Sequence, residues 1–165
     1  MKRVIFILSS CIIILFNSNS YAQSPNNKKL GFGIIIGDPT GLTLIYWNNS
    51  VNAWVMDIGA SYFGSPRIGL EYLWHFSPFD MHAAAIYAGV GGVVGVGEGH
   101  GFWYNNGSGF YARPGSGFGV RGVFGLNYFP KETPLELFAE LGVLVGIVPN
   151  FGSGIDAAVG IRFYP

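Results

Sequence analysis

Three histidines, His75, His82 and His100, are the residues best suited to acid–base or metal chemistry in this chain. They are scattered along the sequence, and none has a second ligand at the spacing typical of a metal site. The only cysteine is Cys11, so thiolate ligation by several cysteines is excluded. The sequence therefore predicts no metal centre and no cofactor.

A second motif with known chemistry is the GxGxxG pattern at residues 117–122. In a dinucleotide-binding fold this pattern follows a strand and opens a helix, which places a pyrophosphate at the helix N-terminus. Here a stretch rich in Gly and Pro precedes the pattern and a strand-like sequence follows it. We therefore predict no dinucleotide site.

The composition points away from an ordinary soluble domain. Of 165 residues, 50% are hydrophobic and 16% aromatic, but only 11% are charged and the formal net charge is zero, whereas soluble domains carry about 25% charged residues. The aromatic content excludes a disordered chain. The lack of a basic excess excludes a nucleic-acid binder.

Residues 1–22 have the pattern of a secretory signal peptide. Lys2 and Arg3 form the positive region, 4–16 the apolar region, and 20–22 a small-residue cleavage site. Residues 23–29 would then form a short periplasmic tail. The alternative is a lipoprotein box at 8–11 that would leave Cys11 acylated, but the apolar run continues beyond this cysteine.

The rest of the chain has the residue pattern of β-strands. A spanning helix needs about 18 or more apolar residues, and the best apolar stretch, 83–97, is shorter, contains five glycines and alternates with a period of two. Turn residues separate similar segments, which we predict as eight strands at 30–37, 41–47, 53–63, 67–76, 83–97, 118–129, 135–148 and 154–164. Residues 133–141 would also suit a capped helix, although 142–148 favour a strand.

The charged residues assign the two faces of these strands. Each strand charge lies opposite a continuous apolar stripe, and a Lys or Arg facing mid-bilayer lipid costs about 2–4 kcal/mol, so the charges are expected to point inward. An eight-stranded barrel is just wide enough inside for side chains to fill it, which predicts a plugged interior. The predicted interior charge network is Asp57, Arg67, Glu71, Arg121, Glu136, Glu140, Asp156 and Arg162.

We therefore predict an all-β fold for residues 30–165, an eight-stranded antiparallel up-and-down transmembrane β-barrel of the bacterial outer membrane. Strand parity places one long connection, 98–117, outside the cell. The predicted aromatic girdle at the periplasmic end is Tyr46, Trp47, Trp54, Trp74, Phe76, Tyr128, Phe129, Phe163 and Tyr164, with Tyr62, Phe63, Phe118 and Phe151 at the other end.

Four stretches, 31–41, 72–75, 134–140 and 156–164, resemble an uncharacterised family of small outer-membrane barrels known from spirochaetes and other double-membraned bacteria. That family is in turn similar to the transmembrane domain of outer membrane protein A. The resemblance implies the fold and the location, and no family-wide activity. The C-terminus is similar to the aromatic signal read by the outer-membrane insertion machinery, but it ends in Pro165.

The long connection is the best candidate for a contact surface, because it combines glycines with residue types enriched at binding hot spots. The candidate contacts are Phe102, Trp103, Tyr104, Tyr111 and Arg113. These residues would bind an extracellular protein partner. The alternative is that they extend the hairpin between the neighbouring strands and lie at the lipopolysaccharide boundary.

The expected function is structural or adhesin-like, with outer-membrane lipid and lipopolysaccharide as surroundings and no catalytic residues. One alternative is a lipid-active enzyme or a binder of a small hydrophobic ligand at the barrel mouth. A Ser–His–acid site at the outer rim would need a histidine there, and strand parity leaves only His100. Another alternative, a soluble periplasmic barrel of lipocalin type, would require a polar exterior.

Overall fold

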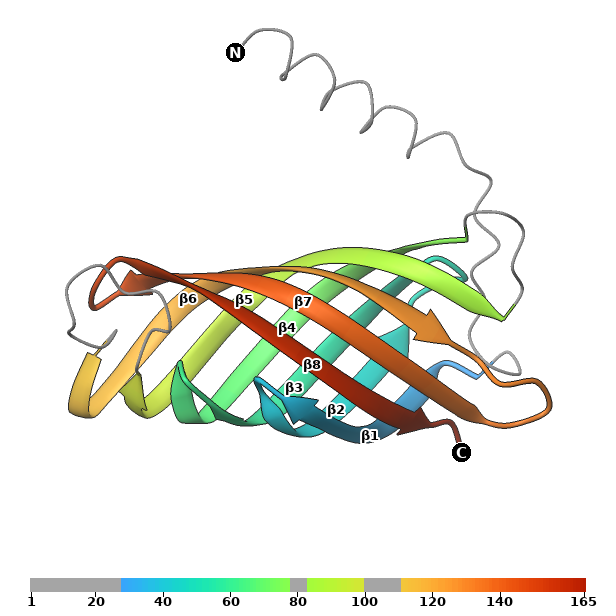
Figure 1. The fold of residues 1–165 in the computed structure, drawn as a ribbon, viewed down its shortest axis with the longest axis horizontal. Coiled ribbons are helices and arrows are strands. Elements are labelled where there is room, and N and C mark those ends of the chain that lie inside the picture. Colours follow the sequence, from blue (N-terminus) through green and yellow to red (C-terminus); the bar gives the residue numbers. More distant parts are fainter. Residues whose placement is uncertain (1–27, 78–82, 100–110) are drawn as a thin grey trace, which may run out of the picture.

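The computed structural model of the chain describes residues 28–77, 83–99 and 111–165. Eight strands make up this part of the chain (Figure 1). They are β1 (Leu30–Gly37), β2 (Thr40–Trp47), β3 (Asn52–Ser61), β4 (Gly64–Phe76), β5 (Ala84–Gly99), β6 (Tyr111–Tyr128), β7 (Leu135–Val148) and β8 (Gly152–Phe163). No helix among the described residues is long and apolar enough to cross a membrane.

The strands form one closed barrel in sequence order. Every strand pairs antiparallel with the next, and β1 pairs with β8 from Phe32↔Phe163 to Gly37↔Ala158. The predicted all-β, eight-stranded, up-and-down barrel is thereby confirmed. We call the end at which β1 begins and β8 ends the proximal end, and the end that carries the β1–β2, β3–β4 and β7–β8 connections the distal end (Figure 1).

Side chains alternate between the lumen and the exterior, as the period of two predicts. In β6, Arg121 and Val123 are buried, whereas Val120 and Phe124 are exposed. Every strand presents large apolar side chains on the outer face, for example Phe32, Leu42, Met56, Leu70, Val90, Phe124, Leu141 and Val159. The barrel therefore has an apolar exterior and an interior in which charged and polar side chains lie among apolar ones.

The strand limits differ most from the prediction at β5 and β6. Their ladder continues through Gly97↔Gly115 to Gly99↔Tyr111, with a register shift between Gly97 and Gly99. The predicted long connection 98–117 is therefore wrong in its bounds, and residues 100–110 join the two strands. An extra residue at a bulge breaks the two-residue period, and the glycines and Pro114 removed the apolar signal from this part of the strand.

Smaller differences occur at β3 and β4. β3 ends at Ser61 and β4 begins at Gly64, where a register shift occurs beside Ser61↔Gly64. β7 is a strand throughout 135–148, so the helical alternative for 133–141 is wrong.

The predicted aromatic girdle is only partly on the outside. Tyr46, Trp54 and Phe163 are exposed, but Trp47 and Tyr164 are almost fully buried in the lumen. Consecutive residues of a strand point to opposite faces, so the neighbour of an outward aromatic residue must point inward. Phe63, predicted at the other interface, is also buried.

Closure of the barrel can be tested with engineered disulfides. Ile34 of β1 lies opposite Ile161 of β8, and Ile161 lies opposite Leu137 of β7. In a Cys11→Ser background, Ile34→Cys with Ile161→Cys should form a disulfide, because paired strands bring Cα atoms to about 4.5–5.5 Å and a disulfide spans about 4.4–6.8 Å. The measurement is the reactivity of the denatured chain toward a maleimide mass tag with and without reductant.

The matched control is Ile34→Cys with Leu137→Cys, which places the two thiols two strands apart, about 9–10 Å. This pair should stay reduced. Equal disulfide yields from the two pairs would contradict the β1–β8 ladder.

Candidate functional site

Arg121 of β6 is the centre of the interior. Its Nη1 donates to Glu71 Oε1 of β4 at 2.7 Å and its Nη2 to Glu140 Oε1 of β7 at 2.9 Å. Its Nε donates to both carboxylate oxygens of Asp156 of β8 at 3.0 Å. All four side chains are buried. One guanidinium therefore joins strands from different parts of the barrel wall, and we call these four residues the central cluster.

A glycine makes room for this cluster. Gly142 lies opposite Asp156 in the β7–β8 ladder and points toward the lumen. A Cβ atom at this position would lie 2.6 Å from Arg121 Nε, which is closer than real Cβ contacts. The absence of a side chain at 142 is therefore a steric requirement of the ion pair.

A second group of polar side chains lies toward the proximal end. Arg162 of β8 donates through Nε and Nη2 to Thr43 Oγ1 at 3.1 and 3.0 Å, and through Nη1 to Glu136 Oε1 at 3.0 Å. The Tyr164 hydroxyl donates to Glu136 Oε2 and accepts a bond from Trp47 Nε1 at 3.0 Å. We call these five residues the proximal cluster. Burial, together with the Glu136 carboxylate, raises the pKa of Tyr164, so its hydroxyl keeps the donated proton.

Aromatic rings fill the space around the proximal cluster. The Arg162 guanidinium lies 3.9 Å from the centroid of the Phe138 ring, a cation–π distance. The His75 ring packs at 4.4 Å from Trp47 and 5.3 Å from Tyr87, centroid to centroid. The Tyr87 hydroxyl donates to Glu140 Oε2 at 2.9 Å, which connects this aromatic group to the central cluster.

The distal part of the interior is more loosely bonded. Arg67 Nη1 lies 3.5 Å from Asp38 Oδ1, 3.5 Å from Asp156 Oδ2 and 3.3 Å from Ser61 Oγ. Within the described part of the chain, its Nε and Nη2 have no hydrogen-bond partner. Arg67 is fully buried, whereas the Asp38 side chain is partly exposed. This end therefore holds its cation by weaker contacts than the other two groups do.

The structure places all eight residues of the predicted interior network in the lumen, where each is buried. Seven of them make the ion pairs described above. Asp57 makes none with the described residues; it lies opposite Thr43 in the β2–β3 ladder, and its Oδ1 has no partner there.

Several participants were absent from the prediction. Thr43 lies between Leu42 and Leu44 on the inward face of β2, so the alternation alone could have identified it. Tyr87 occupies the inward face of β5 in the same way. Asp38 comes from the β1–β2 connection, and no periodic signal marks it. The prediction missed the uncharged partners because it selected interior residues by charge.

Most of the other predicted residues lie where the structure gives no description of the side chain. Phe102, Trp103 and Tyr104 lie outside the described residues, as do His82 and His100. Tyr111 and Arg113 belong to β6, but their side chains are outside the description. The GxGxxG pattern at 117–122 lies within β6, with strand on both sides. The described residues contain no group of His, Cys, Asp and Glu that could hold a metal ion.

Chemically, this arrangement pairs buried charges and fills space. The guanidinium of Arg121 is saturated by carboxylates, and the buried His75 ring faces aromatic neighbours and the carbonyl of Val51. Buried ion pairs of this kind connect strands at a desolvation cost. Comparison with protein-family models, curated proteins and solved structures finds no match to this chain.

The two ends of the network should differ in their response to mutation. Arg121→Met leaves the buried Glu71 and Glu140 without their cation and Asp156 with only the 3.5 Å contact to Arg67, and it should cost about 3–5 kcal/mol in the free energy of unfolding. Arg67→Met should cost clearly less, because Asp156 keeps Arg121 and Asp38 reaches solvent. Urea unfolding followed by tryptophan fluorescence measures both variants. An equal loss would show that Arg121 is not the centre of the network.

Proposed function

We propose that this chain is a small integral outer-membrane β-barrel protein with a closed interior, and that it has a structural or surface-interaction role. The observation that carries the proposal is the reversed polarity of the barrel. The arginines and carboxylates of the strands are buried in the lumen, while large apolar side chains cover the outer wall. This distribution is favourable when the surrounding solvent is lipid.

The outer wall supports contact with lipid along all eight strands. Leu42 and Leu141 are each 61% exposed, and Ile36 is 57% exposed. Soluble monomers rarely expose a contiguous apolar patch larger than a few hundred Å², and here the apolar face surrounds the barrel. A closed barrel also satisfies every backbone group of the ladder without water, as the hydrocarbon core requires.

The aromatic residues at the proximal end support a boundary between lipid and water. Trp54, Tyr72 and Trp74 form an edge-to-face group on the outer wall, with ring centroids 4.8 and 5.1 Å apart. Trp and Tyr are enriched at membrane interfaces because their rings combine an apolar body with a polar group. Because β1 begins and β8 ends at the proximal end, and residues 1–22 have the pattern of a signal peptide, we propose that the proximal end is periplasmic.

The closed interior supports a role other than transport. Between the proximal cluster and the Arg67 group, the lumen contains tightly paired side chains, and Phe63, Val93 and Leu144 form a fully buried apolar cluster. An eight-stranded barrel is filled by its own side chains. Interaction with an extracellular partner would then involve the connection at residues 100–110 and the ends of β5 and β6.

The first test is the mobility of the outer-membrane fraction in a detergent gel, boiled against unboiled. A closed ladder without an edge resists detergent, so the unboiled protein should migrate as a compact form that boiling removes. A soluble periplasmic protein without a shift would contradict the proposal and favour a ligand-binding barrel.

A mutation pair tests whether the outer wall faces lipid. Leu141 lies at the middle of β7, and Phe151, which is 78% exposed, lies in the β7–β8 connection. Leu141→Arg should cost about 2–4 kcal/mol in lipid and strongly reduce the heat-modifiable form, whereas Phe151→Arg near the interface should cost about 0–1 kcal/mol. Similar yields of the folded form from both variants would mean that the mid-strand surface faces water.

Planar-bilayer recordings test whether the lumen is closed. We expect little conductance from the native protein, because buried ion pairs occupy the passage. Large and steady channels would contradict the closed interior and favour a transport role.

A further inference from the structure

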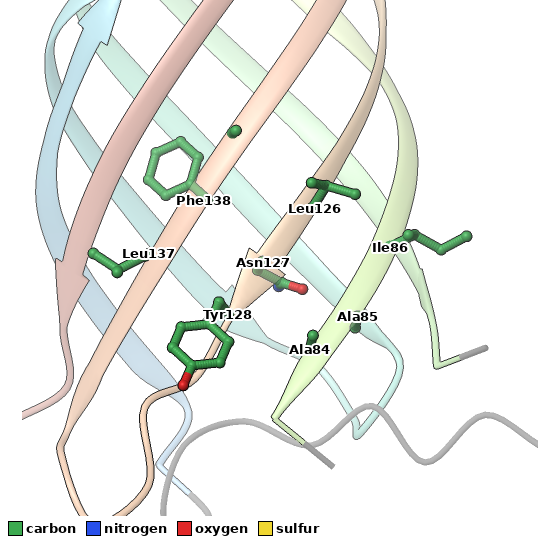
Figure 2. Close-up of a pocket in the computed structure, with 9 residues that line it drawn as sticks. Ala84, Ala85, Ile86, Leu126, Asn127, Tyr128, Leu137 and Phe138 are labelled. Carbon is green, nitrogen blue, oxygen red and sulfur yellow. The ribbon is translucent and has the colours of Figure 1, made fainter. Parts of the chain in front are cut away.

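The apolar outer wall contains a hollow near the proximal end, between β5, β6 and β7. Ile86, Leu126 and Leu137 surround it, and Tyr128 lies at the end next to the β6–β7 connection (Figure 2). The hollow has a volume of about 430 Å³, within the range of roughly 300–1,000 Å³ typical of small-molecule sites.

A second hollow continues the first along β6, β7 and β8. It has a volume of about 500 Å³ and shares Leu126 and Ala139 with the first one. Ala139 lies in one row with Leu126 and Val159, and Ala157 lies beside Leu141. Two alanines among larger neighbours therefore produce a continuous depression, and we call the two hollows together the β6–β7 groove.

Charge on the outer surface is concentrated at one end of this groove. Among the residues whose side chains the structure describes, the charged groups outside the lumen are Lys28, Lys29, Lys131 and Glu132 at the proximal end and Asp38 at the distal end. Lys131 belongs to the connection that follows Tyr128. Lys29 lies beside β2, because the Trp47 backbone N–H donates a hydrogen bond to the Lys29 carbonyl oxygen at 2.7 Å. On these described side chains the proximal end is net positive, and Lys131 is the lysine that lies next to the groove. We call Lys28, Lys29 and Lys131 the lysine collar.

We propose that the β6–β7 groove holds an acyl chain of an anionic phospholipid whose phosphate lies at Lys131 and the Tyr128 hydroxyl. The inference rests on the proposed function, since it needs the outer wall to face lipid. A flexible chain fits a narrow apolar depression, and an anionic headgroup complements the lysines. Phospholipid of the periplasmic leaflet is then bound selectively at this part of the wall.

A second copy of the barrel is a less suitable occupant. Two copies in one membrane have the same orientation, so their lysine collars would meet at the same depth. Like charges placed together at an interface oppose association. The anionic lipid removes this repulsion, whereas a second barrel adds to it.

The experiment uses the full chain in vesicles of phosphatidylethanolamine and phosphatidylglycerol that contain a phosphatidylglycerol probe with a diazirine in its acyl chain. After irradiation, labelled residues are mapped by mass spectrometry. We expect labelling in β6 and β7 around Ala139 to exceed labelling of the rest of the outer wall several-fold. A phosphatidylcholine probe of the same chain length should not show this enrichment.

Two variants identify the contributions of shape and charge. Ala139→Phe fills the groove and should remove the enrichment, whereas the control Ala60→Phe adds the same ring to an exposed outward alanine of β3 and should leave it unchanged. A basic residue near an anionic surface contributes about 1 kcal/mol, which is about fivefold. Lys131→Gln should therefore lower the phosphatidylglycerol enrichment about fivefold.

The outcomes separate this inference from the proposed function. Uniform labelling of the outer wall, or equal enrichment with both probes, would overturn the groove assignment while the barrel remains in the bilayer. Cross-links between two copies at Ala139 would assign the groove to a second barrel. A protein without labelling and without the heat-modifiable form would overturn both the groove and the membrane location.

Discussion

Hydrogen bonding between β1 and β8 is the constraint on which the rest of this structure depends. Closure turns eight strands into a tube whose lumen is only as wide as the side chains that fill it. Because of this width, a single guanidinium at Arg121 reaches carboxylates on β4, β7 and β8 at about hydrogen-bond distance. An open sheet would leave the same charges on one face, in water and far apart.

The residue types of the interior and those of the exterior depend on each other. Side chains that point inward alternate along each strand with side chains that point outward, and the outward set includes large apolar residues on every strand. Exposure of the apolar wall to water would be unfavourable. Exposure of a charged wall to lipid would be unfavourable as well. The ion pairs of the lumen and the apolar wall are therefore compatible with a single environment, and we propose that it is the outer membrane.

The two ends of the barrel differ from each other, as do the inner and outer faces of its wall. At the proximal end, Arg162, Glu136 and Tyr164 form short bonds within a group of aromatic rings, and lysines surround the outside. At the distal end, the contacts of Arg67 with described residues measure 3.3–3.5 Å. This asymmetry places the shorter hydrogen bonds of the proximal cluster at the same end as the lysine collar and the β6–β7 groove.

The sequence by itself determined the strands, their faces and the set of inward charges. Alternation with a period of two is local information, so Arg121 and Asp156 could be assigned to the lumen without knowing their partners. The inward orientation of Trp47 and Tyr164 was also present in the alternation, but the aromatic residue type suggested an interface instead.

Only the tertiary structure decided which charges meet. Pairing depends on register, and a shift of one residue exchanges the two faces of a strand, so the contact of Arg121 with Glu71, fifty residues away, has no local signal. The β4–β5 and β5–β6 ladders place β4 and β6 on either side of β5, and the closed barrel turns their inner faces toward one lumen, where Gly142 leaves space for the ion pair. The β5–β6 bulge likewise followed from the ladder, because glycines and a proline carry no apolar pattern from which it could be predicted.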